Sequence, residues 1–96
     1  MREIVQRPLA RTDLLKIWRY SFERWGEAQA SDYLRHLNQR IRQLALNPRH
    51  GYPLEDVAGE FRSLLVGRHL IVYRFTDRVL VVERILHQRM HVGESF

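Results

Sequence analysis

The sequence predicts an α+β fold in which a helical hairpin packs on a small antiparallel sheet, in the order β-α-α-β-β-β. Three observations carry this prediction. Apolar residues recur at helical spacing in the first half of the chain, β-branched and aromatic runs fill residues 61–86, and a single glycine separates the two helical stretches. Because the chain has 96 residues and no internal repeat, we expect residues 1–96 to form one domain.

The N-terminal run at residues 3–7 predicts an edge strand, and Pro8 then suits the first turn of a helix. This helix is expected to end at Gly26, which can take the positive φ of a helix C-cap. Its apolar face is predicted to consist of Leu14, Ile17, Trp18, Ser21, Phe22 and Trp25.

A second helix is predicted to begin at Glu27 and to stop at Asn47-Pro48. Its apolar positions repeat with a period close to 3.5: Ala30, Tyr33, Leu34, Leu37, Ile41, Leu44 and Ala45. Because the connection between the helices is so short, they must run antiparallel. Their apolar stripes then face each other and a third element.

Residues 49–59 lack periodicity and contain Gly51, Pro53 and Gly59, so we expect a loop within the domain. Three strands joined by tight turns are predicted after it, as an antiparallel meander at residues 61–66, 69–75 and 79–86.

Side chains should alternate along the middle strand, with the more apolar side toward the helices. One side holds His69, Ile71, Tyr73 and Phe75, and the other holds Leu70, Val72 and Arg74.

Composition excludes several kinds of site. The chain has no cysteine, so a disulfide, a thiolate zinc site and a cysteine nucleophile are impossible. The N-terminus is charged and lacks the apolar core of a secretory signal, and no window approaches the ~20 apolar residues that span a bilayer. We therefore expect a cytoplasmic protein.

The net charge of +5 predicts an acidic partner, which could be nucleic acid, an acidic protein segment or a membrane surface. All basic residues except Lys16 are arginine, which suits planar recognition of carboxylate or phosphate. A compositional bias of the genome explains the same excess equally well.

No metal or cofactor is expected. The glycines are too scattered for a phosphate-binding loop, and the histidines at positions 36, 50, 69, 87 and 91 show no metal-ligand pattern on a helix. The aromatic residues Trp18, Phe22, Trp25 and Tyr33 lie in the helical stripes, so a place in the core is favoured over base stacking.

Four segments together resemble the ParE branch of the RelE/ParE toxins, in order and spacing over nearly the whole chain. They are ERWGEAQA (23–30), NPRHGYP (47–53), FRSLLVGRHLIVYRF (61–75) and VERILHQRM (82–90). The resemblance implies the toxin of a type II toxin–antitoxin pair, neutralised by a ParD-like antitoxin that wraps it with an extended and helical segment. It also implies inhibition of DNA gyrase, whereas RelE-branch relatives cut messenger RNA in the ribosome.

RNA cleavage without a metal needs a base, an acid and cations on the phosphate. Similar ribonucleases carry a histidine and a tyrosine, or a tyrosine with several basic residues, near the end of the last strand, where this chain has Arg89 and Met90. Met90 cannot transfer a proton and Arg89 stays charged. These residues favour a non-enzymatic inhibitor.

The alternative is a ribosome-dependent messenger RNA endoribonuclease of the RelE type, which would use His87, Arg62, Arg84 and Glu60. Imidazole titrates near neutrality, so His87 is its main candidate. His87 also belongs to the family pattern, which favours a structural or partner-contacting role, and Glu60 suits a solvated strand start. A third possibility is an inactive relative kept as an antitoxin-binding partner or transcriptional co-regulator.

The arginines at positions 62, 74 and 84 lie on three successive predicted strands. They either converge into a cationic patch for a carboxylate-rich antitoxin segment or target, or they only shield a sheet face with their stems. Neither membrane contact nor sequence-specific nucleic-acid binding by the toxin alone is expected. The residues predicted to contact the antitoxin or target are Arg62, Arg74, Arg84, His87, Arg89 and Met90.

Overall fold

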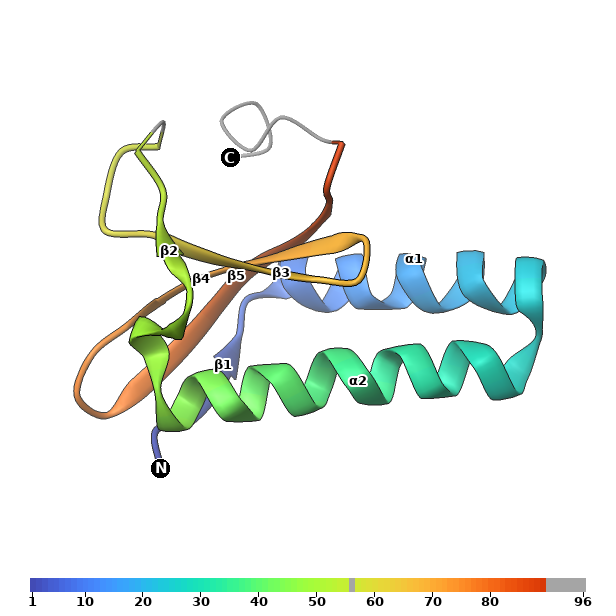
Figure 1. Ribbon diagram of the computed structural model, residues 1–96, viewed down its shortest axis with the longest axis horizontal. Coiled ribbons are helices and arrows are strands. Elements are labelled where there is room, and N and C mark those ends of the chain that lie inside the picture. The colour runs from blue at the N-terminus through green and yellow to red at the C-terminus, as the bar shows by residue number, and fades with distance from the viewer. Residues whose placement is uncertain (56, 90–96) are drawn as a thin grey trace.

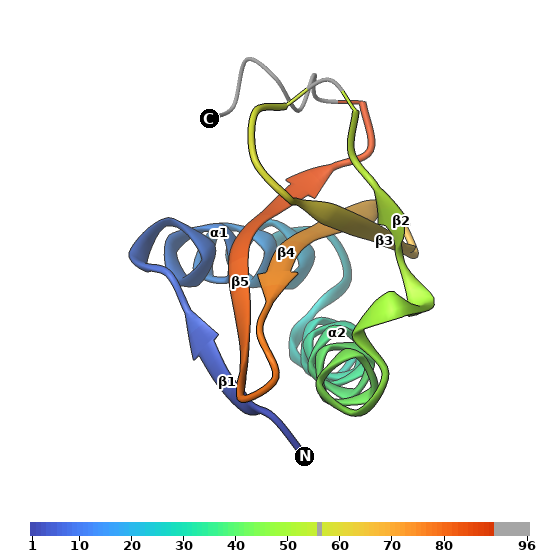
Figure 2. The same cartoon turned by 90° about the vertical axis from the view of Figure 1, so that its left-hand side faces the viewer.

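The computed structural model describes residues 1–55 and 57–89, and it has two layers (Figure 1). One layer is a hairpin of two long helices, and the other is a twisted sheet that lies across it (Figure 2). The α+β class with a helical hairpin packed on a sheet is therefore confirmed.

The two helices end where the sequence places their boundaries. Helix α1 spans Pro8–Trp25 and helix α2 spans Glu27–Leu46. Gly26 joins them with a φ of 87°, and its N–H donates a hydrogen bond to the Phe22 carbonyl. Glycine adopts this φ without strain, so Gly26 allows the chain to reverse its direction between the two helices.

The buried stripe of α1 is narrower than predicted. It consists of Ala10, Asp13, Ile17 and Ser21, which face α2 and the neighbouring strand. The prediction that Phe22 and Trp25 belong to the core is wrong, because their side chains are 44% and 47% exposed. Among the strands, α1 packs mainly against β5, and Phe22 and Trp25 lie in the last turn of this helix.

The sheet has five strands in the order β1-β5-β4-β3-β2. The predicted meander is confirmed as its centre, and the predicted N-terminal edge strand is confirmed as β1, which pairs in parallel with β5. One strand is added at the other edge. The loop predicted at residues 49–59 contains this added strand, β2, preceded by a 3-10 turn, η1 (Pro48–His50). The strands are β1 (Glu3–Gln6), β2 (Tyr52–Pro53), β3 (Arg62–Val66), β4 (His69–Phe75) and β5 (Val79–His87).

A β-bulge interrupts the pairing of β4 with β5. Val72 pairs with Arg84 and the next residue, Tyr73, pairs with Val82, so Glu83 is an extra residue. The bulge shifts the alternation of β5, so that Val82 and Ile85 both join the core against the helices. That core comprises Ala10, Ile17, Leu37, Ile41, Leu44, Ala45, Leu64, Val66, Ile71, Tyr73, Leu80, Val82 and Ile85.

Tyr73 connects the sheet to the end of α2. Its side chain is fully buried, and its hydroxyl donates to the Pro48 carbonyl and accepts from the Gly51 N–H at 3.1 Å. A Cβ atom on Gly51 would overlap this hydroxyl, so glycine is required there for packing. Burial raises the pKa of Tyr73, which keeps the hydroxyl protonated.

Replacing Tyr73 with phenylalanine is expected to lower the free energy of unfolding by about 1–3 kcal/mol, because two buried backbone groups lose their partner. Urea denaturation followed by tryptophan fluorescence measures the loss. Tyr52→Phe is the matched control, since Tyr52 is 74% exposed and should change stability by less than about 0.5 kcal/mol. Equal stability of the two variants would contradict the role of the Tyr73 hydroxyl.

No helix in the described part of the chain is both long enough and apolar enough to cross a membrane.

Candidate functional site

A groove of about 900 Å³ lies beside the closed end of the helical hairpin, near the junction at Gly26. It lies between the second half of α1, the first half of α2, the β3–β4 turn and the end of β5, which Figure 1 places on one side of the molecule. We call it the hairpin groove. It is lined by Asp13, Lys16, Ile17, Tyr20, Ser21, Trp25, Gln29, Asp32, Tyr33, His36, Gly67, Arg68, His69, Arg84, Ile85 and His87.

Small residues in the hairpin and the turn create this hollow. Ser21 is buried and occupies a position where a larger side chain would fill the groove. Gly67 has a φ of 58°, and a Cβ atom there would collide with the Tyr33 ring. The half-exposed side chains of Tyr20 and Trp25 form an edge-to-face aromatic pair on one wall. The groove thus combines an aromatic wall with a polar inner end.

The inner end contains a cluster of Tyr33, His69 and His87, in which Tyr33 and His69 are hydrogen-bonded and His69 and His87 are in ring contact. The Tyr33 hydroxyl lies 2.6 Å from His69 Nδ1, and it accepts from the Arg68 N–H at 3.2 Å. His69 faces His87 directly across the two strands, with ring centroids 5.5 Å apart. The register of β4 with β5 fixes this pairing, so the backbone holds the two imidazole rings side by side.

The electrostatics of the cluster favour neutral Tyr33 and His69 side chains. The pKa of His69 is lowered from 6.5 to about 4, chiefly by burial and secondly by His87, and Asp13 partly opposes this shift. Burial also raises the pKa of Tyr33, against the opposing effect of Arg68. His69 is therefore uncharged at neutral pH. Its neutral ring has one nitrogen that donates and one that accepts hydrogen bonds in the groove.

Acid should destabilise the protein through His69. Its pKa is lower in the folded state, so its contribution to stability is complete above pH 6.5 and is lost as the pH falls toward 4. Because the ring is only half-buried, we expect a loss on the order of 1–2 kcal/mol. Urea denaturation of the wild type and of His69→Gln between pH 6.5 and 4.5 measures it. The variant should show a flatter pH dependence than His50→Gln, and identical slopes would contradict the assignment.

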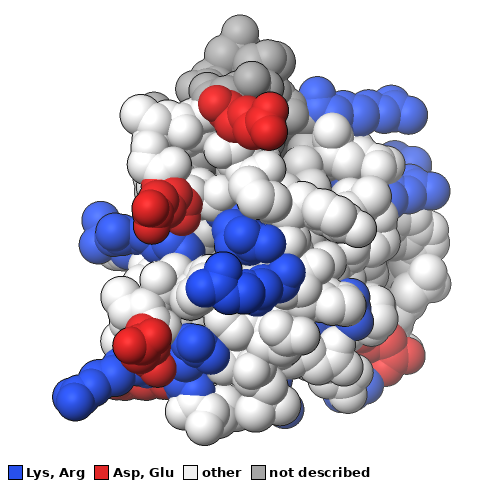
Figure 3. Space-filling view, turned by 60° about the vertical axis from the view of Figure 1, so that its left-hand side comes forward, with Lys and Arg blue, Asp and Glu red and all other residues white. Residues whose placement is uncertain are grey.

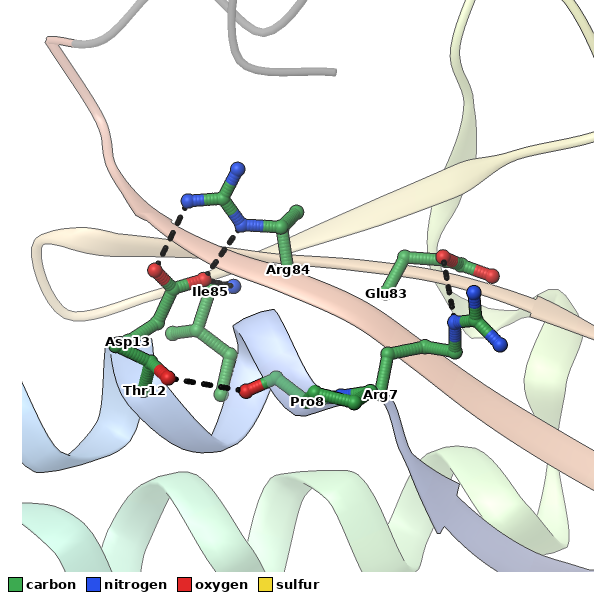
Figure 4. Close-up of polar contacts among 7 residues, drawn as sticks. All are labelled: Arg7, Pro8, Thr12, Asp13, Glu83, Arg84 and Ile85. Carbon is green, nitrogen blue, oxygen red and sulfur yellow. Dashed lines mark hydrogen bonds and ion pairs between the residues drawn. The ribbon is translucent and has the colours of Figure 1, made fainter.

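Asp13 joins α1 to the edge of β5 at the floor of the groove (Figure 4). Strand β1 stops at Gln6, so it leaves the Ile85 N–H without a strand partner, and Asp13 Oδ2 accepts this N–H at 2.9 Å. The same carboxylate accepts two hydrogen bonds from Arg84, at 2.8 Å and 3.0 Å. Asp13 raises the pKa of Arg84, whose guanidinium stays charged and fixed.

The arginines at 62, 74 and 84 do not gather into one patch. Arg62 pairs with Tyr73 and lies on that side of the sheet, where it donates to the Gly51 carbonyl at 2.7 Å. Arg74 and Arg84 lie on the other side, because Arg74 follows Tyr73 along β4 and Arg84 pairs with Val72. Of the three, only Arg84 lines the hairpin groove.

Glu83, the extra residue of the bulge, holds the Arg74 side chain in an ion pair. Its carboxylate pairs with Arg74 at 2.7 Å and with Arg7 at 3.8 Å, and Figure 4 shows the second of these contacts. Most of the Glu83 side chain is covered, whereas both arginine side chains are more than half exposed. The bulge therefore holds two cations on the surface outside the groove.

The other predicted site residues are separated as well. His87 is the last residue of β5 and lines the groove, whereas Glu60 lines a second hollow with Arg74 and Phe75 near the other end of the sheet. Arg89 is exposed, and its N–H donates to His87 Nδ1 at 3.2 Å. The predictions for Met90 and His91 lie outside the described residues.

Sequence reasoning missed Asp13, Tyr33 and His69 as site residues. Tyr33 was assigned to the core, yet its hydroxyl reaches the groove. An aspartate within the buried stripe of α1 was the available signal for Asp13, because a buried carboxylate requires a partner. Within residues 1–55 and 57–89, no three histidine or acidic side chains lie close enough to hold a metal ion.

Known proteins are similar to this chain over most of its length. Residues 4–92 match the family model described as the ParE toxin of the type II toxin–antitoxin system parDE. Toxin ParE1 of Mycobacterium tuberculosis is 41% identical over 89 residues, covering 92% of this chain and 91% of the relative. Toxin ParE1 of Caulobacter vibrioides is 42% identical over 82 residues, covering 85% and 84%.

A solved structure described as the chromosomal ParDE TA system from P. aeruginosa has a similar fold, with a TM-score of 0.78. The match covers 91% of this chain and 96% of that chain at 18% sequence identity. At this identity the likeness supports the fold alone. The two ParE1 sequences are much more similar to this chain, at 41% and 42% identity.

Proposed function

The chain belongs to the ParE family of type II toxins, and on this premise we propose that a ParD-like antitoxin neutralises it by binding in the hairpin groove. We further propose that the toxin acts by binding DNA gyrase and carries out no RNA cleavage. The observation that carries the first proposal is the groove itself, and the dispersion of the candidate catalytic residues supports the second.

The groove suits a helical or extended segment with both apolar and acidic side chains. Tyr20 and Trp25 offer half-exposed aromatic surface to an apolar anchor. Lys16 and Arg68 are exposed on the groove lining and can pair with carboxylates at its rim. The match to a structure described as a ParDE system agrees with an antitoxin as the partner.

The nuclease residues predicted from the sequence do not converge at one point of the described part of the chain. The candidate base Glu60 and the candidate acid His87 line different hollows. The Arg62 guanidinium donates to main-chain carbonyls, and the Arg84 guanidinium is paired with Asp13. Neither arginine is therefore positioned together with both Glu60 and His87 around one phosphate.

One observation favours the alternative, an endoribonuclease of the RelE type. Tyr33, His69 and His87 meet at the inner end of the groove, and two imidazoles beside a phenol can in principle transfer protons. This set differs from the one predicted from the sequence, since only His87 is common to both. The alternative therefore predicts loss of cleavage in both His69→Ala and His87→Ala.

The proposals are tested by incubating purified toxin with DNA gyrase and, in parallel, with ribosomes translating a messenger RNA. We expect inhibited supercoiling, intact RNA and relief of inhibition by the antitoxin encoded beside the toxin. The variant His87→Ala should still inhibit supercoiling. Cleaved RNA that becomes intact in His87→Ala would establish the alternative, and no effect in either assay would indicate an inactive relative.

A further inference from the structure

Two arginines contact the same aromatic ring at the opposite end of β4 from the hairpin groove. The Arg2 guanidinium lies 5.3 Å from the centroid of the Phe75 ring, and the Arg49 guanidinium lies 5.6 Å from it. These residues come from the N-terminus, from η1 and from the last position of β4. Residues far apart in the sequence are thus brought together to hold two like charges on one ring.

The two guanidiniums are held in different ways. Arg2 donates from Nε to the Thr76 carbonyl at 2.7 Å and from an Nη to the Ala45 carbonyl at 3.4 Å, so its plane is fixed against the β4–β5 turn. Arg49 is exposed, and its contact within the described residues is the Phe75 ring. Arg2 is therefore preorganised, and Arg49 can adjust to a ligand.

Neither arginine forms an ion pair within residues 1–55 and 57–89, where the carboxylates of Asp13, Asp32 and Glu83 pair with other arginines. Three other charged residues are close in sequence to Arg2 or Phe75: Glu3, Asp77 and Arg78. Arg78 is exposed, and its carbonyl accepts a hydrogen bond from the Glu3 N–H. Figure 3 looks toward this end of the molecule and shows blue side chains touching near the centre of the face, with red ones toward its edge.

We propose that Arg2, Arg49 and Phe75 form a binding site for the phosphate groups of a nucleic-acid backbone. A guanidinium stacked on a ring directs its edge donors outward, and these donors match phosphate oxygens. Arg2 keeps its second Nη for this purpose, and Arg49 keeps its whole edge. An exposed ion pair with a single protein carboxylate contributes little binding free energy. Each neutralised phosphate of a nucleic acid releases counterions, and this release favours binding. Contacts to phosphates alone carry no sequence information, so binding is independent of sequence. The site does not depend on the proposed gyrase target.

The test measures fluorescence anisotropy of a labelled single-stranded 20-mer DNA titrated with full-length toxin at several salt concentrations. The double variant Arg2→Gln/Arg49→Gln is expected to bind at least tenfold more weakly, with the salt slope reduced by about one to two. The matched control is Arg11→Gln/Arg19→Gln, which removes the same charge from two exposed positions of α1. This control should change affinity less than twofold.

The single variant Arg49→Gln distinguishes weaker binding from loss of folding, because the Arg49 side chain donates no hydrogen bond within the described part of the chain. It should weaken binding at least threefold with an unchanged melting temperature. Equal loss in the Arg2/Arg49 and Arg11/Arg19 variants would overturn the site, since total charge would then explain binding. Undetectable DNA binding would also overturn it, and so would equal affinity for a 20-residue polyglutamate peptide.

Discussion

Replacing Asp13 with alanine is expected to lower the free energy of unfolding by about 3–5 kcal/mol, a large part of the stability of a small domain. The substitution leaves the Ile85 N–H without a partner and removes the counter-ion of Arg84, whose side chain is only 16% exposed. Urea denaturation at neutral pH, followed by circular dichroism, measures the loss. The helix would also lose its polar attachment to β5.

An exposed ion pair on the other helix provides the matched control. Asp32 pairs with Arg35 at a comparable distance, but both side chains are more than half exposed. Asp32→Ala should therefore cost less than about 1 kcal/mol. If the Asp13 and Asp32 variants were equally stable, the account of how α1 is fixed to the sheet would be wrong.

Replacing Trp25 with alanine is expected to weaken antitoxin binding about 30- to 100-fold, as for a central aromatic anchor of an interface. Trp25 lies on the wall of the hairpin groove and is 47% exposed in the free toxin, so its loss should affect binding more than folding. Isothermal titration calorimetry with the purified antitoxin measures the change.

Phe22 provides the control for Trp25. It lies on the same helix, is 44% exposed and stacks on Trp18, but it does not line the groove. Phe22→Ala should change the affinity for the antitoxin by less than about threefold. A larger effect for Phe22 than for Trp25 would move the antitoxin contact to the outer face of α1.

Elements with a strong local signal could be predicted from the sequence. Gly26 and Asn47-Pro48 marked the helix ends, and the short turns marked the meander. The parallel pairing of β1 with β5 joins residues more than seventy positions apart, and no local pattern encodes it. The two-residue strand β2 contains a proline and has too few residues to show alternation.

The functional site was harder to predict, because its residues are also brought together by contacts between distant parts of the chain. The β-bulge at Glu83 changes which residues of β5 share a face, so Arg62, Arg74 and Arg84 could not be placed together or apart from their spacing. The pairing of His69 with His87 follows from the register, and the Asp13–Arg84 contact joins residues 71 positions apart. Two of the predicted residues, Arg84 and His87, do line the hairpin groove.

Hydrogen–deuterium exchange of the toxin with and without its antitoxin tests whether the antitoxin binds in the hairpin groove. We expect slower exchange in the complex at the helix junction around Gly26, at the Gly67–Arg68 turn and at the end of β5, all of which border or line the hairpin groove. Protection confined to β1, η1 and the β4–β5 turn, with no change at the groove, would contradict this binding site.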